Sequence, residues 1–297
     1  MAVLEKKIDF ALVFSVKNAN PNGDPLSGNM PRVTINSISE SIGEVSDVCL
    51  KRKIRDRLLE AGENIFVQSD DNRKDAYKSL KDRAVGVLKD AMKDNDALRE
   101  KACKTWIDVR SFGQVFPYKG KEKGSGLSLG IRGPVTIQSA FSLDNVNITS
   151  IQITKSVNNQ DAPKKKEEED ESNESMSPDR MGMKHRVDFG LYATYGSMNP
   201  QLAEKTGFSY EDAQKIKRAL LHIFDNDASA ARPEGSMEVV QLCWWEHSSK
   251  SGQYSSAKVH QSLHITLKDG VKQAKSAGDY AIAVQPLAGL EPEIVTY

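Results

Sequence analysis

The stretch that most constrains the fold lies at residues 8–16, where nearly every position is apolar and aromatic and branched side chains dominate. A strand with one face in water alternates polar and apolar residues, whereas a continuous apolar run is typical of a fully buried strand. Residues 8–16 are therefore predicted to form a buried central strand of a sheet.

A polar loop follows this strand and continues to Gly43. It opens with the turn formers of residues 18–25, in which Asn22-Gly23 can supply the positive φ of a tight turn. A loop of this length is uncommon in a compact domain and is usually functional or disordered. We therefore expect residues 18–43 to be one of the two.

A basic helix is predicted to begin within residues 45–57. Its apolar residues recur at every fourth position and form a narrow stripe of Leu50, Ile54 and Leu58. Lys51 and Arg55 lie on one side of the stripe, and Lys53 and Arg57 lie on the other. Like charges at this spacing cost a few tenths of a kcal/mol unless an anion lies between them. The helix is therefore either a solvated amphipathic helix or an anion-binding surface.

The remaining segments alternate strands with helices. Helical spacing at 70–104 predicts a charged helical excursion, which we interpret as an insertion at 62–105. Ser209 and Asp212 have the spacing of a capping box and predict the start of another helix. Further strands are predicted at 64–68, 106–116, 133–142, 237–245, 258–267 and 280–285. This order predicts a single α+β domain over residues 1–297 with an antiparallel-leaning sheet.

A long hairpin is predicted at 150–190. Residues 151–154 and 181–191 alternate polar and apolar side chains, as strands with one apolar side do. The charged run between them has nothing to bury, and its tip at 161–179 is expected to be disordered. The hairpin is therefore predicted to project from the body, with exposed methionine as an adaptable apolar surface.

Composition limits the class of protein. Lys+Arg and Asp+Glu both number 41, so the chain is not generally basic, although a local patch can still bind an anion. Three widely spaced cysteines indicate reduced thiols. The chain has no apolar run long enough to span a membrane and no signal-peptide core at its start. We expect a soluble, cytoplasmic protein without membrane contact.

Motifs for catalysis are weak. Residues 126–130 match the G-x-S-x-G string of serine hydrolases, but Gly133-Pro134 follows too closely for the helix which that motif requires. Two spacings resemble metal half-sites but are atypical for zinc and fall in predicted strands: Cys243 with His247, and His260 with His264.

Asp24 and Asp108 lie near predicted strand ends, where turn capping or solvation accounts for them. No phosphate-cradling or dinucleotide-binding motif is present. The sequence therefore predicts no catalytic residues, no metal and no cofactor.

Several motifs, in order along most of the chain, resemble one family. They are Asn20-Pro21-Asn22-Gly23-Asp24-Pro25 with Gly28-Asn29-Met30-Pro31-Arg32, then residues 45–55, 106–113 and 130–135, and finally Met181-Gly182-Met183-Lys184-His185 with Gly190-Leu191-Tyr192. Together they resemble the repeated backbone (RAMP-type) subunit of the type I-C CRISPR Cascade surveillance complex.

The resemblance implies an RRM-like (ferredoxin-like) palm, a helical fingers insertion at 62–105 and a β-hairpin thumb at 150–190. It implies a non-enzymatic subunit whose copies form a helical filament along the spacer of CRISPR RNA, and whose thumb displaces nucleotides of the guide–target duplex. The other implied partners are target DNA, the 5′-handle-binding, large and small Cascade subunits, and a helicase-nuclease recruited on target binding.

The resemblance also implies RNA-binding residues: Asn22, Arg32, Ser46, Lys51, Arg52, Arg55, Arg110, Arg132, Met183, Lys184 and His185. Lys51 and Arg55 match the guide-backbone cations of the family, whereas Arg52 points to the other side of the helix and Lys53 and Arg57 are expected to be solvated. Met183 is suited to pack on a displaced base. The aromatic signature of an RRM is lacking, so we expect backbone binding that ignores sequence.

Two other functions stay open. One is a metal-dependent ribonuclease on the same fold, with Asp24 as its nearest candidate. The other is a self-assembling structural protein whose basic helix meets acidic neighbours.

Overall fold

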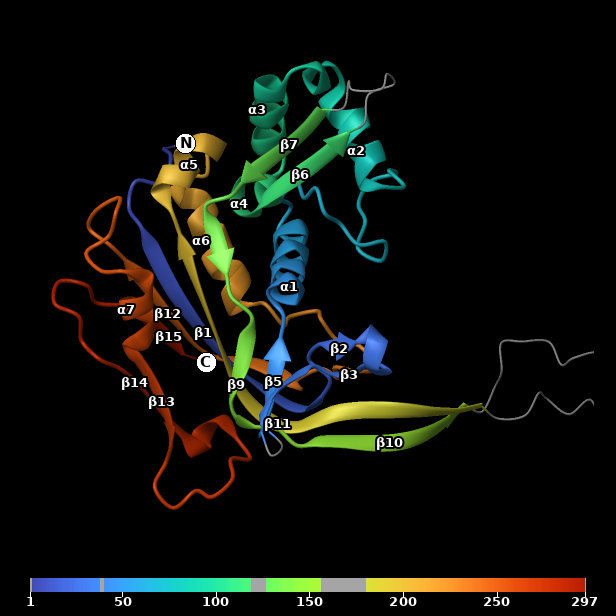
Figure 1. Cartoon of the computed structure of the whole chain (residues 1–297), viewed down its shortest axis with the longest axis vertical. Helices are drawn as coiled ribbons and strands as arrows, with labels where there is room; N and C mark the ends of the chain where they lie inside the picture. Colours follow the sequence, from blue (N-terminus) through green and yellow to red (C-terminus); the bar gives the residue numbers. More distant parts are fainter. Residues whose placement is uncertain (1, 38–39, 119–126, 156–179, 297) are drawn as a thin grey trace, which may run out of the picture.

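The computed structural model describes residues 2–37, 40–118, 127–155 and 180–296 (Figure 1). Its strands are β1 (Ile8–Ala19), β2 (Gly23–Asp24), β3 (Met30–Pro31), β4 (Val33–Ser37), β5 (Glu40–Val45), β6 (Gly113–Tyr118), β7 (Leu127–Arg132), β8 (Val135–Ile137), β9 (Ala140–Asn145), β10 (Ile148–Lys155), β11 (Arg180–Met198), β12 (Met237–Glu246), β13 (Leu263–Leu267), β14 (Tyr280–Val284) and β15 (Glu293–Thr296).

The α-helices are α1 (Asp47–Glu60), α2 (Leu80–Leu88), α3 (Asn95–Thr105), α4 (Ile107–Phe112), α5 (Pro200–Thr206), α6 (Tyr210–Leu221) and α7 (Ser256–Gln261). Short 3-10 helices occur at η1 (Pro25–Ser27), η2 (Lys89–Lys93) and η3 (Ala277–Asp279). Within the described ranges, no helix has both the length and the hydrophobicity that crossing a membrane requires.

An antiparallel sheet forms the body of the molecule, with strand order β15-β12-β1-β11-β9-β5-β4 and with β8 and β10 also pairing with β11. β1 lies between β12 and β11, and its residues 8–14 are all buried. The prediction of a buried central strand is confirmed, because a strand with layers on both faces can be apolar at every position.

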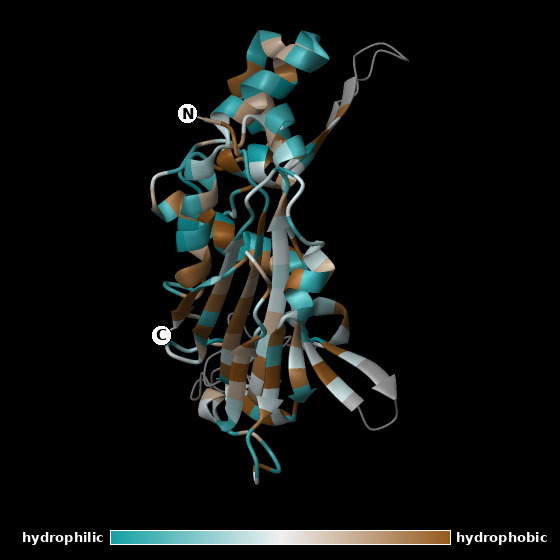
Figure 2. Ribbon diagram, turned by 90° about the vertical axis from the view of Figure 1, so that its left-hand side faces the viewer, coloured by the Kyte–Doolittle hydropathy of each residue, from teal (hydrophilic) through white to brown (hydrophobic). Residues whose placement is uncertain are grey.

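Helices cover one face of this sheet. Phe10, Leu12 and Phe14 of β1 point to this face and share a hydrophobic core with Ile54 of α1 and Ile216 of α6. Figure 2 shows hydrophobic residues along the strands and on the helices beside them. The apolar stripe predicted for α1 is thereby confirmed as a packing face, and the capping box of Ser209 with Asp212 is present at the start of α6.

The C-terminal segment covers part of the other face. Val13 of β1 packs there in a second core with Val259 of α7 and Tyr280 of β14. A buried polar contact, in which His247 Nε2 lies 2.8 Å from an Asp9 carboxylate oxygen, ties this segment to β1. Both faces of the central sheet are therefore covered, each by a different part of the chain.

A third core lies at the end of the molecule where α2, α3 and α4 pack with the β6–β7 hairpin (Figure 1). Phe66 contacts Trp106 and Phe116 there at ring-centroid distances of 4.7 and 5.3 Å. The helical region predicted at 70–104 begins later than expected, at Leu80.

The β10–β11 hairpin extends away from the body (Figure 1). Its antiparallel register places Met183 opposite Gln152 and His185 opposite Ser150. The two predicted strands of the 150–190 hairpin are therefore present, and its predicted tip at 161–179 lies outside the described residues.

Several predicted elements differ in the structure. The strand predicted at 106–116 is instead α4 followed by β6, and the strand predicted at 258–267 begins with α7. No strand forms at 64–68, where the carboxylate of Asp108 binds the backbone N–H groups of Phe66 and Val67. Short apolar runs do not separate helix from strand by periodicity alone, so tertiary contacts decide these cases.

The segment predicted as a loop at 18–43 contains regular secondary structure. It contains the β2–β3 hairpin, η1, and strands β4 and β5, which extend the main sheet. Positive φ angles occur at Gly28 and Asn29 and not at Gly23. The hairpin therefore turns at a different glycine from the one that the Asn22-Gly23 pair indicated.

Candidate nucleic-acid interface

The segment that follows β1 is held by its own polar side chains. Asn20 Nδ2 donates to the carbonyl of Asn29 at 2.7 Å, and the Asp24 carboxylate accepts from the backbone N–H of Leu26 at 3.2 Å. A Cβ atom at Gly23 would collide with the side chain of Asn29. A side chain at this position would therefore force Asn29 to move.

Asn22 and Ser46, two predicted site residues, meet at the start of α1. Asn22 Oδ1 accepts hydrogen bonds from the backbone N–H of Ser46 at 3.0 Å and from its Oγ at 2.9 Å. Ser46 Oγ in turn accepts from the backbone N–H of Cys49 at 3.3 Å and caps the helix. These bonds fix the β1–α1 connection against a helix N-terminus, which carries a partial positive charge.

Each basic residue of α1 contacts a carboxylate of the same chain. The pairs are Lys51–Asp47, Arg52–Asp56, Lys53–Asp227, Arg55–Asp108 and Arg57–Glu60. The anions that relieve the like-charge spacing are therefore the protein's own side chains. The prediction that Lys53 and Arg57 are solvated is wrong, because their exposed fractions are only 4% and 9%.

The α1 cations differ in how firmly they are held. Arg55 lies 3.0 Å from Asp108, a fully buried carboxylate, and its guanidinium also stacks 5.2 Å from the ring centre of Phe112. Arg52 has a side chain that is 45% exposed and lies near Asp56 and Asp71, and Lys51 is 23% exposed and pairs with the 38% exposed Asp47. Exposed ion pairs are worth about 0–1 kcal/mol, so a phosphate can replace the carboxylate at Lys51 or Arg52.

A polar recess of about 430 Å³ opens between α1, residues 21–23 and the loop at 226–232. Four cations line it, together with three carboxylates: Arg52, Lys53, Arg57 and Arg232, and Asp56, Asp71 and Asp227. Burial lowers the pKa of Lys53, and the neighbouring Asp227 carboxylate partly offsets this effect. Arg57 Nε is buried and has no hydrogen-bond partner among the described residues. The recess beside Asn22 therefore contains the buried cation Lys53 and a hydrogen-bond donor, Arg57 Nε, that has no partner among the described residues.

The other predicted arginines are spread over the molecule. Arg110 forms two hydrogen bonds of 2.8 Å with the buried Asp212 and links α4 to α6. Arg132 is exposed on β7, which packs in the core of α2, α3 and α4, and Arg32 lies 3.4 Å from Asp24. The structure thus brings Arg32 near the loop of Asn22 but places Arg110 and Arg132 on other elements.

Met183, Lys184 and His185 lie on β11 within the projecting hairpin. Met183 is 55% exposed and is on the same face as His185, whose Nδ1 lies 2.7 Å from Ser150 Oγ. Lys184 is on the opposite face, with the exposed Ile151 as its cross-strand partner. The three predicted hairpin residues therefore serve two different faces.

Asp24, the candidate for a ribonuclease, is hydrogen-bonded within its own loop. Asp24 accepts from Ser27 Oγ, and this bond, with the Leu26 N–H, lowers the pKa of the Asp24 carboxyl. Among the described residues, no group of three or more His, Cys, Asp and Glu side chains lies close enough to hold a metal ion.

Comparison with known proteins places the chain in a family. The family model described as "CRISPR-associated protein Cas7" matches residues 6–285. The chain belongs to the Cas7 family. One relative, the CRISPR-associated protein Cas7 of Haloferax volcanii, is 24% identical over 227 residues. That alignment covers 70% of this chain and 61% of the relative, so the chain spans less than two thirds of the relative's length.

Solved structures with a similar fold include two chains of CRISPR RNA-guided surveillance complexes. One is 17% identical, with a TM-score of 0.47, and the match covers 90% of this chain and 78% of the other. The second, from a complex in a pre-nicking state, is 14% identical, with a TM-score of 0.43 and coverages of 80% and 78%.

In this Cas7 family member, sequence reasoning missed the contribution of the loop after α6. Arg232 and Asn226 line the recess beside α1, although more than 200 residues separate them from Asn22. A usable signal was present, because a polar stretch with an Arg-Pro-Glu-Gly turn follows the capped helix α6. The periodicity of a sequence does not show which loops lie at the same end of a sheet. The Arg-Pro-Glu-Gly stretch could therefore be predicted as a turn, but its place beside α1 could not.

Proposed function

We propose that the protein is a non-catalytic backbone subunit of a CRISPR RNA-guided surveillance complex of type I-C, and that it binds the sugar-phosphate backbone of the guide RNA. The observation that carries this proposal is the polar recess beside Asn22, which four cations and three carboxylates line and in which the side chain of Arg52 is 45% exposed. Membership of the Cas7 family supports the same function.

The chemistry of the recess favours phosphate over bases. Its lining offers four cations, three carboxylates, amides and a hydroxyl, and none of the described lining residues is aromatic. Contacts to phosphates position a nucleic acid but carry no sequence information. A subunit that must accept any spacer requires this kind of binding.

The predicted RNA-binding residues then divide into two roles. Lys51, Arg52 and Arg32 are partly exposed and contact the guide phosphates. Arg55 and Arg110 are bound to the buried carboxylates of Asp108 and Asp212 and position α1 and α4. Asn22 and Ser46 set the path of the loop, and Arg132 is a further exposed cation on β7.

The projecting hairpin acts as the thumb, next to an RRM-like palm and the fingers of the 62–105 insertion. Exposed Met183 packs against a displaced base, because its flexible thioether adapts to any base. Lys184 binds a phosphate from the other face of the hairpin, and His185 is held by Ser150. The thumb thereby supports recognition of target DNA.

Copies of the chain assemble as a helical filament along one CRISPR RNA. The further partners we propose are a 5′-handle-binding subunit, large and small subunits, and a helicase-nuclease that cuts the DNA after target binding. We thus assign cleavage to another protein.

Salt-dependent RNA binding tests this function. Affinity for a labelled single-stranded RNA is measured over a range of salt concentrations for Lys51→Ala/Arg52→Ala and for a control, Lys78→Ala/Lys81→Ala, in which both lysines are exposed on the fingers side. Each phosphate contact contributes about 0.7 to the slope of log affinity against log salt for single strands. The site variant should therefore lose about 1.4 of slope.

If the salt dependence of RNA binding had the same slope in both variants, Lys51 and Arg52 of α1 would not contact phosphates. RNAs with different spacer sequences should bind alike, since the contacts go to the backbone. Incubation of the RNA-bound protein with complementary RNA and Mg²⁺ should leave both strands intact. A cleavage product that disappears in Asp24→Asn would instead establish a ribonuclease.

A further inference from the structure

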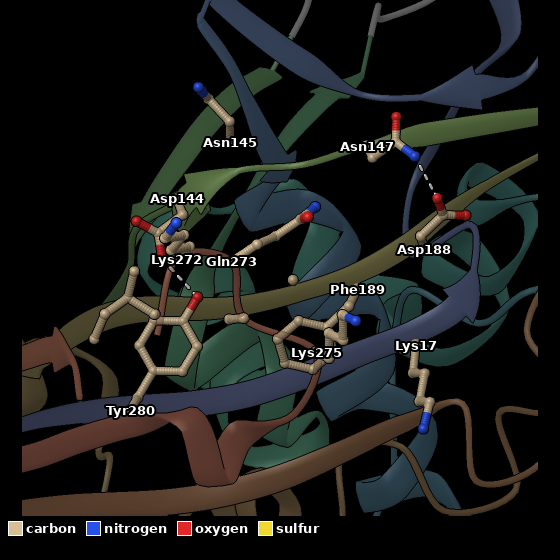
Figure 3. A pocket seen from close by; sticks show the side chains of 13 residues that line it. Lys17, Asp144, Asn145, Asn147, Asp188, Phe189, Lys272, Gln273, Lys275 and Tyr280 are labelled. Carbon is tan, nitrogen blue, oxygen red and sulfur yellow. Dashed lines mark hydrogen bonds between the residues drawn. The ribbon is translucent and has the colours of Figure 1, made fainter. Parts of the chain in front are cut away.

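A second cavity, of about 680 Å³, lies away from the α1 recess, between the base of the hairpin and the C-terminal segment (Figure 3). Its floor comes from β1 and β11, and its walls come from the end of β9, the loop after β13 and the start of β14. The volume falls in the range of roughly 300–1,000 Å³ that ligand sites occupy.

Three exposed lysines line this cavity: Lys17 of β1, and Lys272 and Lys275 of the loop between β13 and η3. None of them has a carboxylate partner within ion-pair distance among the described residues. The loop lysines are far from Lys17 in sequence, so the fold has gathered positive charge from two separate segments. Clustered lysines are the electrostatic footprint of phosphate binding.

The two carboxylates of the cavity are both engaged. Tyr280 donates its hydroxyl to Asp144 at 2.6 Å, and Asn147 Nδ2 donates to Asp188 (Figure 3). Burial, followed by the bond to Asp144, raises the pKa of Tyr280, so the phenol keeps its proton and remains a donor. The three lysines thus differ from these carboxylates in having no ion-pair partner among the described residues, and they can meet an anionic ligand.

An aromatic ring accompanies these lysines. Phe189 of β11 is the direct cross-strand partner of Lys17, and it lines the cavity as a half-buried side chain. Its face of the sheet is covered elsewhere by Val259 and the β13–β14 hairpin. At the cavity, this face of the sheet is open, and the ring of Phe189 lies there beside the cation Lys17. Unstacked bases bind to aromatic rings in this way, with the backbone on nearby cations.

We infer that this cavity is a second site for single-stranded nucleic acid, in which one unstacked base packs on Phe189 and the adjoining phosphates contact Lys17, Lys272 and Lys275. The inference rests on the proposed function for the class of ligand and adds a site on the opposite face of the sheet. The strand is either the guide RNA or the target DNA, since both offer this chemistry.

Binding measurements on two sets of variants test the site. The pocket variants are Lys17→Gln/Lys272→Gln/Lys275→Gln and, separately, Phe189→Leu, which keeps apolar packing but removes the ring. The control is Lys78→Gln/Lys81→Gln/Lys205→Gln, three exposed lysines away from the cavity. Each protein is titrated with labelled single-stranded RNA alone and, when loaded with RNA, with complementary single-stranded DNA.

The triple pocket variant should lose about 2 in salt slope, because each phosphate contact contributes about 0.7. Phe189→Leu should weaken binding about ten-fold at unchanged slope, and Phe189→Tyr should bind like the unsubstituted protein. A loss with RNA alone assigns the site to the guide, and a loss seen only with DNA assigns it to the target strand.

The inference is overturned if the pocket triple and the control triple show the same affinity and slope in both titrations. If Lys51→Ala/Arg52→Ala still weakens RNA binding in that case, the proposed function stands without the second site. Failure of the unsubstituted protein to bind RNA overturns both.

Discussion

The guanidinium of Arg110 joins two elements through a buried carboxylate. Its two hydrogen bonds of 2.8 Å go to Asp212, which also accepts the backbone N–H of Ser209 at the start of α6. Burial alone would raise the pKa of Asp212, but the bonds from Arg110 and Ser209 outweigh it and hold the pKa below its usual value. The pair thus attaches α4 to α6.

Loss of the Arg110 side chain should leave this carboxylate buried without its counterion. We expect Arg110→Ala to lower the free energy of unfolding by about 3–5 kcal/mol, measured by urea denaturation. Arg99→Ala removes an arginine that pairs with the exposed Asp96 and should change stability by less than about 0.5 kcal/mol. Equal effects of the two substitutions would show that the Arg110 pair does not hold the helices together.

His260 predicts a pH dependence of stability. This residue of α7 has a largely buried ring that faces β1 and β11, with Nε2 3.1 Å from the carbonyl of Gly196 and 3.9 Å from Asp9. Burial lowers the pKa of His260 more than Asp9 raises it. Below about pH 6.5 the unfolded chain therefore binds a proton before the folded chain does, and stability falls with pH until the folded-state pKa is reached.

Urea midpoints at pH 7 and pH 5 should accordingly differ less for His260→Gln than for the unsubstituted protein. The exposed His264 provides a matched control, and His264→Gln should keep the original pH dependence. An unchanged difference in His260→Gln would mean that other groups cause it. Asp9 and Asp212 have lowered pKa values and lose their contribution only at more acidic pH.

At the scale of elements, α1 serves both the core and the proposed interface. One face packs Leu50 and Ile54 on the sheet, while the flanks carry cations that are each matched to a carboxylate. Its start is fixed by Ser46 and by the contact with Asn22. The position of the side chains that we propose to bind phosphate therefore depends on the cap.

Removing that cap should affect stability and binding together. Ser46→Ala should cost about 1–2 kcal/mol of unfolding free energy and weaken RNA binding, because the loop of Asn22 is no longer fixed. Ser79→Ala removes the comparable cap of α2, where Ser79 Oγ accepts from the backbone N–H of Asp82. That control should lose stability only. If the Ser46→Ala and Ser79→Ala variants bound RNA with equal affinity, the cap of α1 would have no role in RNA binding.

At the scale of the whole molecule, the β10–β11 hairpin projects from the body and exposes apolar side chains. Ile153 and Met183 are 45% and 55% exposed on the hairpin, and exposed apolar surface at a projecting element is typical of a contact region. A backbone subunit with such a projection should assemble on RNA and not without it.

Sedimentation should test this assembly. We expect the sedimentation coefficient to rise in steps with RNA length, and nuclease footprints to show protection at a regular interval. Met183→Glu, a change at an exposed position, should leave the monomer folded and alter the footprint or the response to DNA. Filaments that form equally without RNA would favour a self-assembling structural protein instead.

The sequence by itself determined the elements whose pattern is local. The apolar run of residues 8–16 forms a strand buried on both faces, the spacing of Leu50 and Ile54 produces the core face of α1, and alternation marks the β10–β11 hairpin. Buried positions recur with the period of the helix or strand, so they can be recognised from the sequence alone.

Only the tertiary structure decided the partners of the charges. Asp108 is 53 residues from Arg55, and Asp212 is 102 residues from Arg110. It also decided that 107–112 is helical, and that Lys17 lies beside Phe189. Ion pairs and cavities depend on which segments the fold brings together, and no periodicity along the sequence records that.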